Sequence, residues 1–302
     1  MGNDIDDAMA LALLHALQSR GECQLLAVTL TKNDPMAGPF VDAINTFYGR
    51  SEIPIGVCRD HGTNSGSRYL KLAAVRDGDR WRYPHDLENS TAPEAQELIR
   101  RILTAQPDNS VTLVQVGFFS NLAGLLDTPA DLELLRRKVK LLCIMAGGFR
   151  PAEMNRHFLE YNVKCDIPAA RKLAEKWPTP IVWSGFEIGD ALRYPAASIE
   201  RDFSYVPHHI IAEAYCLYQP PPHERPTWDL TAALQAVRPD RGYFDLSPSG
   251  RVTVEADGFM RFDPAEKGRD RFLILNAGQV SRTRETLVQL VIEPPHCAPE
   301  IR

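Results

Sequence analysis

The chain has 302 residues, of which 44% are hydrophobic and 24% are charged, and its formal net charge is −5. A chain of this length and composition can bury a substantial core without disulfide or metal staples. The acidic balance argues against nucleic acid or an anionic membrane as a partner, because both require a basic face.

Six cysteines are scattered along the chain, and none has the spacing of a zinc or redox motif. We therefore expect reduced thiols in a cytoplasmic protein. No stretch approaches the ~18 apolar residues of a membrane span. Because the sequence opens directly into a polar motif, it leaves room for an upstream signal peptide.

Residues 8–17 form the first predicted helix, which is apolar almost all round, as in a helix packed deep against a sheet. Short β-branched runs then alternate with helical patterns, which predicts parallel βα units. A second helix is expected over residues 94–105, where Thr91 and Glu94 have the spacing of a capping box. The predicted strands are residues 25–30, 53–57, 111–116, 141–145 and 181–183.

The pattern changes after about residue 190. Helices are expected over residues 208–218 and 229–237, β-hairpins over residues 243–275, and a closing helix over residues 281–292. The predicted fold class is α/β, with an open, mostly parallel, Rossmann-like sheet flanked by helices and a C-terminal helical and β-hairpin elaboration. We expect a single domain over residues 1–302, with the α/β core in residues 1–190 and the elaboration in residues 191–302.

Three acidic residues stand together at the start of the first predicted helix. They are Asp4, Asp6 and Asp7, within the segment Gly-Asn-Asp-Ile-Asp-Asp of residues 2–7. In an open α/β sheet, ligands bind at the carboxyl ends of the strands, where the following helices begin. Helix capping and the helix dipole account for one or two acids. The third adds repulsion that a bound cation would relieve, and oxygen ligands suit Ca²⁺ or Mg²⁺. The segment therefore predicts a metal site.

Several separated blocks resemble the inosine-uridine-preferring nucleoside hydrolases, in the same order over roughly residues 2 to 240. Residues 2–11 look like the N-terminal signature of that family. Trp228 and Asp229 stand where the family usually has His-Asp. The other matching blocks are residues 111–117 and 120–123 for the central strand and its loop, 145–148 for a methionine-glycine turn, and 160–166 for a Glu-Phe-Asn segment.

The resemblance implies hydrolysis of the N-glycosidic bond of a ribonucleoside, giving free base and ribose, with a bound Ca²⁺ that activates water. Asp7, Asp229 and the carbonyl of Val116 are the implied metal ligands. Asp6 and Trp228 are the implied catalytic residues, and both also contact substrate. The remaining implied ribose-site residues are Asn33, Met145, Asn155, Glu160 and Asn162. The resemblance also implies a homodimer or homotetramer that serves purine and pyrimidine salvage.

The chain departs from the family pattern at its start. The family has an upstream apolar strand ending in Asp-x-Asp, whose second aspartate binds metal and orients the attacking water. Here Met1 stands just after that position, so neither the strand nor the two aspartates is in the sequence. Our hypothesis is a misplaced start codon or a truncated chain. Equal melting temperature and activity with and without the upstream codons would contradict it.

A second departure is Trp228, because the family histidine at that position is thought to protonate the leaving base and tryptophan cannot. Stacking on the base is one interpretation, and plain packing is another. The preferred base therefore stays open, as does the source of the proton. The candidate proton donors are His157, His223, Tyr161 and Tyr243.

A third departure precedes Glu160, where the family commonly has an asparagine six residues upstream. Met154 occupies that position and Asn155 is one place off. Asn155 is expected to serve the ribose 5′-hydroxyl if the loop shifts.

Two other functions are compatible with the residues. One is a non-catalytic or degenerate member of the same fold that binds a ribosyl ligand, which the missing aspartates and Trp228 favour. The other is a Mg²⁺ phosphohydrolase, which lacks support because no Walker-type phosphate loop occurs. The sequence assigns no role to Asp4.

Overall fold

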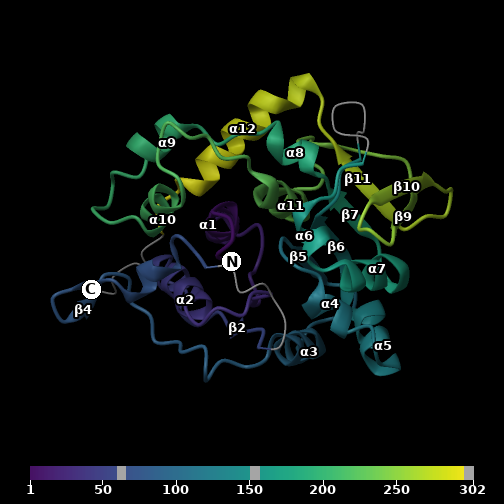
Figure 1. The fold of residues 1–302 in the computed structure, drawn as a ribbon, viewed down its shortest axis with the longest axis horizontal. Helices are drawn as coiled ribbons and strands as arrows, with labels where there is room; N and C mark the ends of the chain where they lie inside the picture. The colour runs from purple at the N-terminus through teal and green to yellow at the C-terminus, as the bar shows by residue number, and fades with distance from the viewer. Residues whose placement is uncertain (60–65, 150–156, 296–302) are drawn as a thin grey trace. The chain divides into compact units, whose positions relative to one another are not determined.

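The computed structural model describes residues 1–59, 66–149 and 157–295 (Figure 1). Its contacts divide the chain into two compact units. Unit 1 consists of Met1–Leu98, Arg193–Arg225 and Arg284–Arg302, and unit 2 consists of Ile99–Leu192 and Pro226–Thr283. The expectation of a single domain over residues 1–302 stays a prediction. In the described parts of the chain, no helix is long and apolar enough to cross a membrane.

Unit 1 is built around helix α1 (Asp6–Ser19), which packs against α2 (Ala37–Phe47) and α10 (Ile210–Tyr218). Met9, Leu13 and Leu17 are among its fully buried side chains, which explains the nearly uniform apolar pattern of this helix. The other elements of this unit are η1 (Leu70–Ala74), α9 (Ala196–Arg201), the parallel pair β1 (Val28–Thr29) and β2 (Ile55–Gly56), and the hairpin β3 (Arg76–Asp77) with β4 (Arg80–Trp81).

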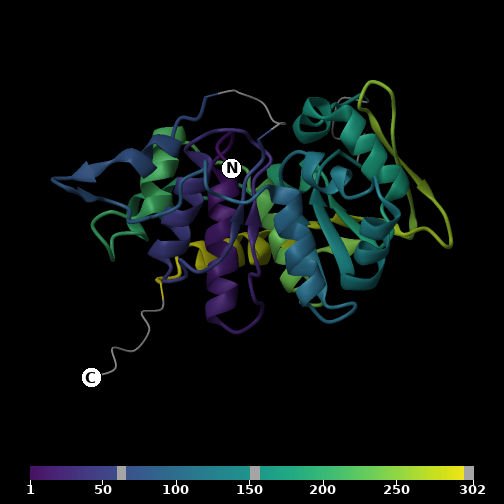
Figure 2. The same ribbon diagram turned by 90° about the horizontal axis from the view of Figure 1, so that it is seen from below.

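Unit 2 contains the main sheet, in which β5 (Val111–Gln115), β6 (Val139–Met145) and β7 (Ile181–Ser184) are parallel. β11 (Asp270–Ile274) continues the parallel part beyond β7. The sheet is therefore mostly parallel, as predicted. An antiparallel hairpin of β9 (Gly250–Val254) and β10 (Met260–Pro264) extends from it (yellow-green in Figure 2), and β8 (Asp245–Leu246) pairs with β11.

Helix α11 (Trp228–Val237) packs against β5, β6 and β7, and its residues 229 to 235 are all buried. It begins one residue before the predicted helix. The other helices of this unit are α4 (Ser120–Gly124), α5 (Pro129–Lys138), α6 (Tyr161–Cys165), α7 (Ile167–Lys176) and α8 (Phe186–Asp190), whereas α3 (Ala95–Ala105) and α12 (Ala277–Val291) each belong partly to both units.

Two helix starts differ from the sequence predictions. The prediction of a capping box between Thr91 and Glu94 is wrong. Glu94 caps the helix itself, because its carboxylate accepts the backbone N–H groups of Gln96 (2.7 Å) and Glu97 (3.3 Å). Thr91 instead donates its hydroxyl to the carbonyl of Glu88.

Helix α12 starts four residues before the predicted position. Asn276 and Gln279 satisfy each other's backbone N–H groups through their side chains, at 2.9 and 3.2 Å, and so form a reciprocal cap. The sequence pattern also missed α2, in which Pro39 lies in the first turn, where a helix tolerates proline.

Tyr69 fixes the first residues of the chain inside unit 1. Its ring is fully buried, and its hydroxyl accepts the N–H of Gly2 (2.9 Å) and donates to the carbonyl of Asp4 (2.5 Å). Gly2 has a φ of +108°, which residues with a side chain rarely adopt. One buried hydroxyl therefore satisfies two backbone groups of an irregular segment.

We predict that Tyr69→Phe lowers the free energy of unfolding by about 1–3 kcal/mol, because it leaves the N–H of Gly2 buried without an acceptor. The matched control is Tyr48→Phe, whose buried hydroxyl has no partner among the described residues. The control should leave stability unchanged or raise it. Equal losses for both variants in urea unfolding would contradict the role given to Tyr69.

Candidate active site

Asp6 and Asp7 open helix α1, where the helix dipole favours negative charge. Asp6 is 2% exposed, and the carboxylate of Asp7 lies 3.2 Å from the amino group of Met1. Burial raises the pKa of Asp7, the neighbouring Asp4 raises it further, and the Met1 ammonium opposes both. The positive charge of the Met1 amino group therefore favours the ionised form of Asp7.

The loop after β1 holds Lys32 and Asn33. Lys32 is 2% exposed, and its ammonium donates to the side-chain oxygen of Asn3 at 2.8 Å. Burial lowers the pKa of Lys32, while Asp34 and Asp7 act in the opposite direction. Sequence reasoning missed this residue. The only signal was a lysine directly before the asparagine expected to contact ribose.

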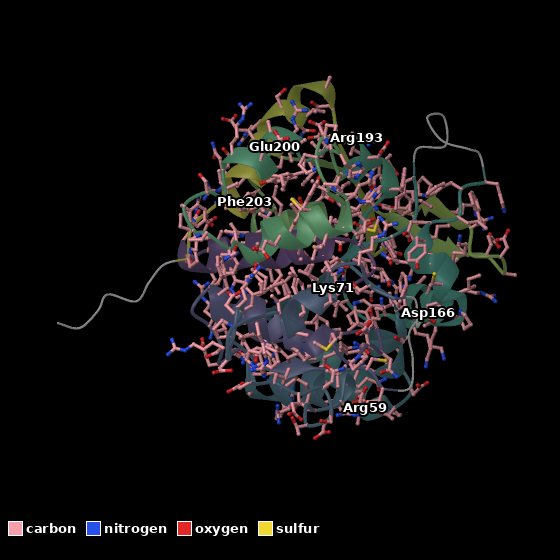
Figure 3. All side chains as sticks on the ribbon, turned by 60° about the vertical axis from the view of Figure 1, so that its left-hand side comes forward. Arg59, Lys71, Asp166, Arg193, Glu200 and Phe203 are labelled. Atoms are coloured by element: carbon pink, nitrogen blue, oxygen red, sulfur yellow. The ribbon has the colours of Figure 1, made fainter. Side chains whose placement is uncertain are left out.

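Asn33 itself is exposed, and its amide donates to the carbonyl of Arg59 at 2.5 Å. Arg59, labelled in Figure 3, is held in turn by the carbonyl of Ala92 at 2.6 Å. These contacts fix the position of the Asn33 side chain within unit 1.

In unit 2, the parallel strands β5 and β6 bring three predicted site residues together. The side-chain amide of Asn162 lies 3.3 Å from the carbonyl and 3.4 Å from the sulfur of Met145, and 3.5 Å from the carbonyl of Val116. Val116 directly follows β5 and Met145 ends β6. This is the arrangement expected at the carboxyl ends of parallel strands.

Glu160 is buried beside them, with 4% of its surface exposed. Its carboxylate caps α6, accepting the N–H groups of Asn162 (2.8 Å) and Val163 (3.2 Å), and also that of Gly147 (3.4 Å). Burial raises the pKa of Glu160 to about 7, and these hydrogen bonds oppose the rise. The group therefore changes charge near neutral pH.

Trp228 and Asp229 begin α11, and Asp229 is 4% exposed in its first turn. The indole N–H of Trp228 donates to the carbonyl of Phe186 at 2.9 Å, and the two rings lie 5.2 Å apart at an interplanar angle of 34°. Phe158 packs on Phe186 with a centroid distance of 4.7 Å. Because its indole N–H is already donated to Phe186, the side chain of Trp228 can offer a ligand its aromatic face. Sequence reasoning missed both phenylalanines.

The predicted residues divide between the units. Unit 1 holds Asp6, Asp7 and Asn33, and unit 2 holds Val116, Met145, Glu160, Asn162, Trp228 and Asp229. Asn155 lies outside the described residues.

The residues implied as metal ligands can be compared with the ligand types that a divalent cation prefers. In the part of the chain that the structure describes, no group of three or more His, Cys, Asp or Glu side chains could hold a metal ion. The implied ligands, Asp7, Asp229 and the carbonyl of Val116, offer only oxygen, which Ca²⁺ and Mg²⁺ prefer. The side chain of Asp7 is 11% exposed and its pKa is raised, so a cation beside it would favour its ionised form.

The four candidate proton donors lie in different environments. His157 hydrogen-bonds Asp257 at 2.6 Å and stacks on Phe259, whereas burial lowers the pKa of His223. Tyr161 is 47% exposed at the start of α6, and Tyr243 is buried. All four stay candidates.

The sequence model of the inosine-uridine preferring nucleoside hydrolase family matches residues 1–284. The chain belongs to this family. Membership makes it a ribonucleoside hydrolase, an enzyme that cleaves N-glycosidic bonds. No curated protein matches this hydrolase.

Solved structures of similar fold cover nearly the whole hydrolase. A plant nucleoside hydrolase has a TM-score of 0.73 at 18% identity, covering 97% of this chain and 98% of its own. An inosine-uridine preferring nucleoside hydrolase from Bacillus anthracis has a TM-score of 0.71 at 17% identity, with 96% and 97% covered. The type III effector XopQ, solved with adenosine diphosphate ribose, has a TM-score of 0.69 at 16% identity, with 98% and 91% covered. These identities show a shared fold.

Glu160 gives the hydrolase a pH-dependent stability. Its folded pKa of about 7 lies above its usual value of about 4.3, so the folded state binds more protons between these two pH values. We predict that the unfolding free energy of the wild type, relative to Glu160→Gln, falls as the pH rises from 4 to 7. Urea unfolding of both proteins at several pH values measures this difference in unfolding free energy. Glu133→Gln, which changes an exposed carboxylate, is the control, and a constant difference for Glu160→Gln would contradict the prediction.

Proposed function

We propose that this enzyme hydrolyses ribonucleosides to free base and ribose in a Ca²⁺-dependent reaction, by attack of water on an oxocarbenium-like ribosyl centre. The observation that carries the proposal is the group formed by Val116, Met145, Glu160 and Asn162 at the ends of β5 and β6. The family resemblance assigns a site role to each of these four residues. Their placement together supports the assignment.

Glu160 and Asn162 are proposed to bind the ribose hydroxyls. A carboxylate that ionises near pH 7 can accept hydrogen bonds from hydroxyl groups, and a carboxamide can both donate and accept. Such bonds strengthen as the sugar ring gains oxocarbenium character. Asp6 is the proposed catalytic partner, and the other proposed ribose contacts are Asn33, Met145 and Asn155.

Asp7, Asp229 and the carbonyl of Val116 are proposed to hold the cation. A bound divalent cation supplies a water molecule of lowered pKa. Both carboxylates stand in the first turn of a helix, and Asp229 is buried there. The chain contributes negative charge and the exclusion of bulk water.

Trp228 is proposed to stack on the base rather than to protonate it. Its N–H is already donated to the carbonyl of Phe186, which fixes the orientation of the indole. The proton for the leaving base must then come from another group, for which His157, His223, Tyr161 and Tyr243 are the candidates. The preferred base is left open.

We predict that Trp228→Ala raises KM or lowers kcat on nucleosides by about tenfold, the effect of removing one stacking ring, and leaves Ca²⁺ affinity unchanged. Trp228→Phe keeps a ring and should lose less. Trp81→Ala, in the β3–β4 hairpin, is the control. Unchanged kinetics in Trp228→Ala would count against a substrate role.

Ribose release from a panel of purine and pyrimidine nucleosides tests the proposed reaction. We expect release that stops with a chelator, returns with Ca²⁺, and falls about 100-fold or more in Asp7→Asn and Asp229→Asn. Release that is indifferent to the chelator would refute the metal role. No release from any nucleoside would refute the reaction.

A second candidate is binding of a ribosyl ligand without catalysis. Trp228 in place of a proton-donating histidine favours it, and the effector XopQ, of similar fold, was solved with adenosine diphosphate ribose. Calorimetric binding of adenosine diphosphate ribose or ribose, with no base released from any nucleoside, would identify this function instead.

We also propose a cytoplasmic homodimer or homotetramer that serves nucleoside salvage. Light scattering coupled to size exclusion measures the assembly, and a monomer at micromolar concentration would contradict it.

A further inference from the structure

We infer that Asp4 and Arg225 form a positioning pair that fixes the segment leading into Trp228 and Asp229. This inference rests on the proposed function, because it concerns two residues of the proposed site. Neither member of the pair was assigned a role by the sequence.

The pair is bidentate and half-buried. Nε of Arg225 donates to one carboxylate oxygen of Asp4 at 2.9 Å, and Nη2 donates to the other. The side chain of Asp4 is 25% exposed and that of Arg225 is 20% exposed. Paired bonds of this kind fix direction as well as distance, which a single lysine contact cannot do.

Asp4 is also held by contacts with Ile5, the residue before α1, and with Tyr69. Its carboxylate also accepts the N–H of Ile5 at 2.6 Å, and its carbonyl accepts the hydroxyl of Tyr69. Asp6 and Asp7 follow in the same turn. The carboxylate thus belongs to the segment that carries the acidic residues of the proposed site.

Arg225 is fixed through its backbone as well as its side chain. Its N–H donates to the hydroxyl of Tyr215 at 2.9 Å, and its carbonyl accepts the N–H of Tyr194 at 2.8 Å. Tyr218 lies against its guanidinium, with 5.1 Å from the ring centroid to Cζ. The ion pair is one of several contacts that leave Arg225 little freedom.

The segment that joins Arg225 to Trp228 and Asp229 is short and conformationally restricted. Pro226 comes next, and its ring restricts its own φ and the conformation of the residue before it. Thr227 is buried, and its hydroxyl donates to the carbonyl of Leu192 at 2.6 Å. One proline thus separates two anchored residues, so the Asp4–Arg225 pair holds the upstream end of this short segment and Thr227 holds the end next to Trp228.

Asp4→Asn and Arg225→Lys test the pair, because each keeps the size of the side chain and removes the bidentate geometry. The matched controls are Asp77→Asn and Arg82→Lys. That pair also joins a guanidinium to both carboxylate oxygens, at 2.7 and 3.1 Å, but it lies at the β3–β4 hairpin. Hydrogen exchange of peptides covering residues 223–232 is measured together with kcat and KM for nucleosides.

We expect exchange in residues 223–232 to rise about fivefold in both test variants, the equivalent of roughly 1 kcal/mol. We expect kcat/KM to fall about 10- to 100-fold, as small misplacements do. The double variant should be no worse than the poorer single one, because the two residues act through one contact. The control variants should stay within about twofold.

The inference is overturned if the hydrogen-exchange rate of residues 223–232 in the test variants equals that in the control variants. It is also overturned if kcat/KM in Asp4→Asn equals that of Asp77→Asn while the wild type is active. If the wild type releases no base from any nucleoside, the proposed function fails, and the exchange experiment alone decides whether the pair holds the segment.

Discussion

The predicted site residues of each unit include a carboxylate that is largely removed from water, and each needs hydrogen bonds or opposite charge to offset the cost of its burial. Burying an ionised group costs free energy unless hydrogen bonds or opposite charge offset it. Glu160 is compensated by three backbone N–H groups, yet its pKa is still raised to about 7. Asp7 has the Met1 ammonium beside it, and burial still raises its pKa. The contacts of Glu160 and Asp7 therefore do not fully offset the cost of burying their ionised forms, and a bound ligand could supply the remaining stabilisation.

The parallel sheet of unit 2 supplies the geometry for this chemistry. Because β5 and β6 run in the same direction, their last residues meet at one edge, and the amide of Asn162 lies near the carbonyls of Val116 and Met145. Helix α11 packs on the same strands and presents Asp229 in its first turn. Backbone direction, more than any individual side chain, decides which residues can cooperate in this unit.

Sequence reasoning succeeded where local pattern determines structure. The apolar runs of residues 111–116, 141–145 and 181–183 became the parallel strands β5, β6 and β7, because buried parallel strands are apolar throughout. It failed where a polar side chain acts locally in a way that composition does not reveal. Glu94 caps its own helix, and a reciprocal cap moves the start of α12 to Ala277.

The candidate site shows the same division. The family resemblance named Met145, Glu160 and Asn162 as ribose-site residues, which stays a prediction, and the structure places the amide of Asn162 3.3 Å from the carbonyl of Met145. It could not name Phe186 or Arg225, because their roles arise from contacts with residues far along the chain. Such contacts exist only once the chain has folded.

The most direct test of the account is hydrolysis of inosine or uridine in water enriched in oxygen-18, without phosphate. The account predicts base and ribose in equal amounts, with the heavy oxygen on C1 of ribose at early times and none on the base. Base release without labelled ribose, or no base released from any nucleoside of the purine and pyrimidine panel after prolonged incubation with Ca²⁺, would contradict it.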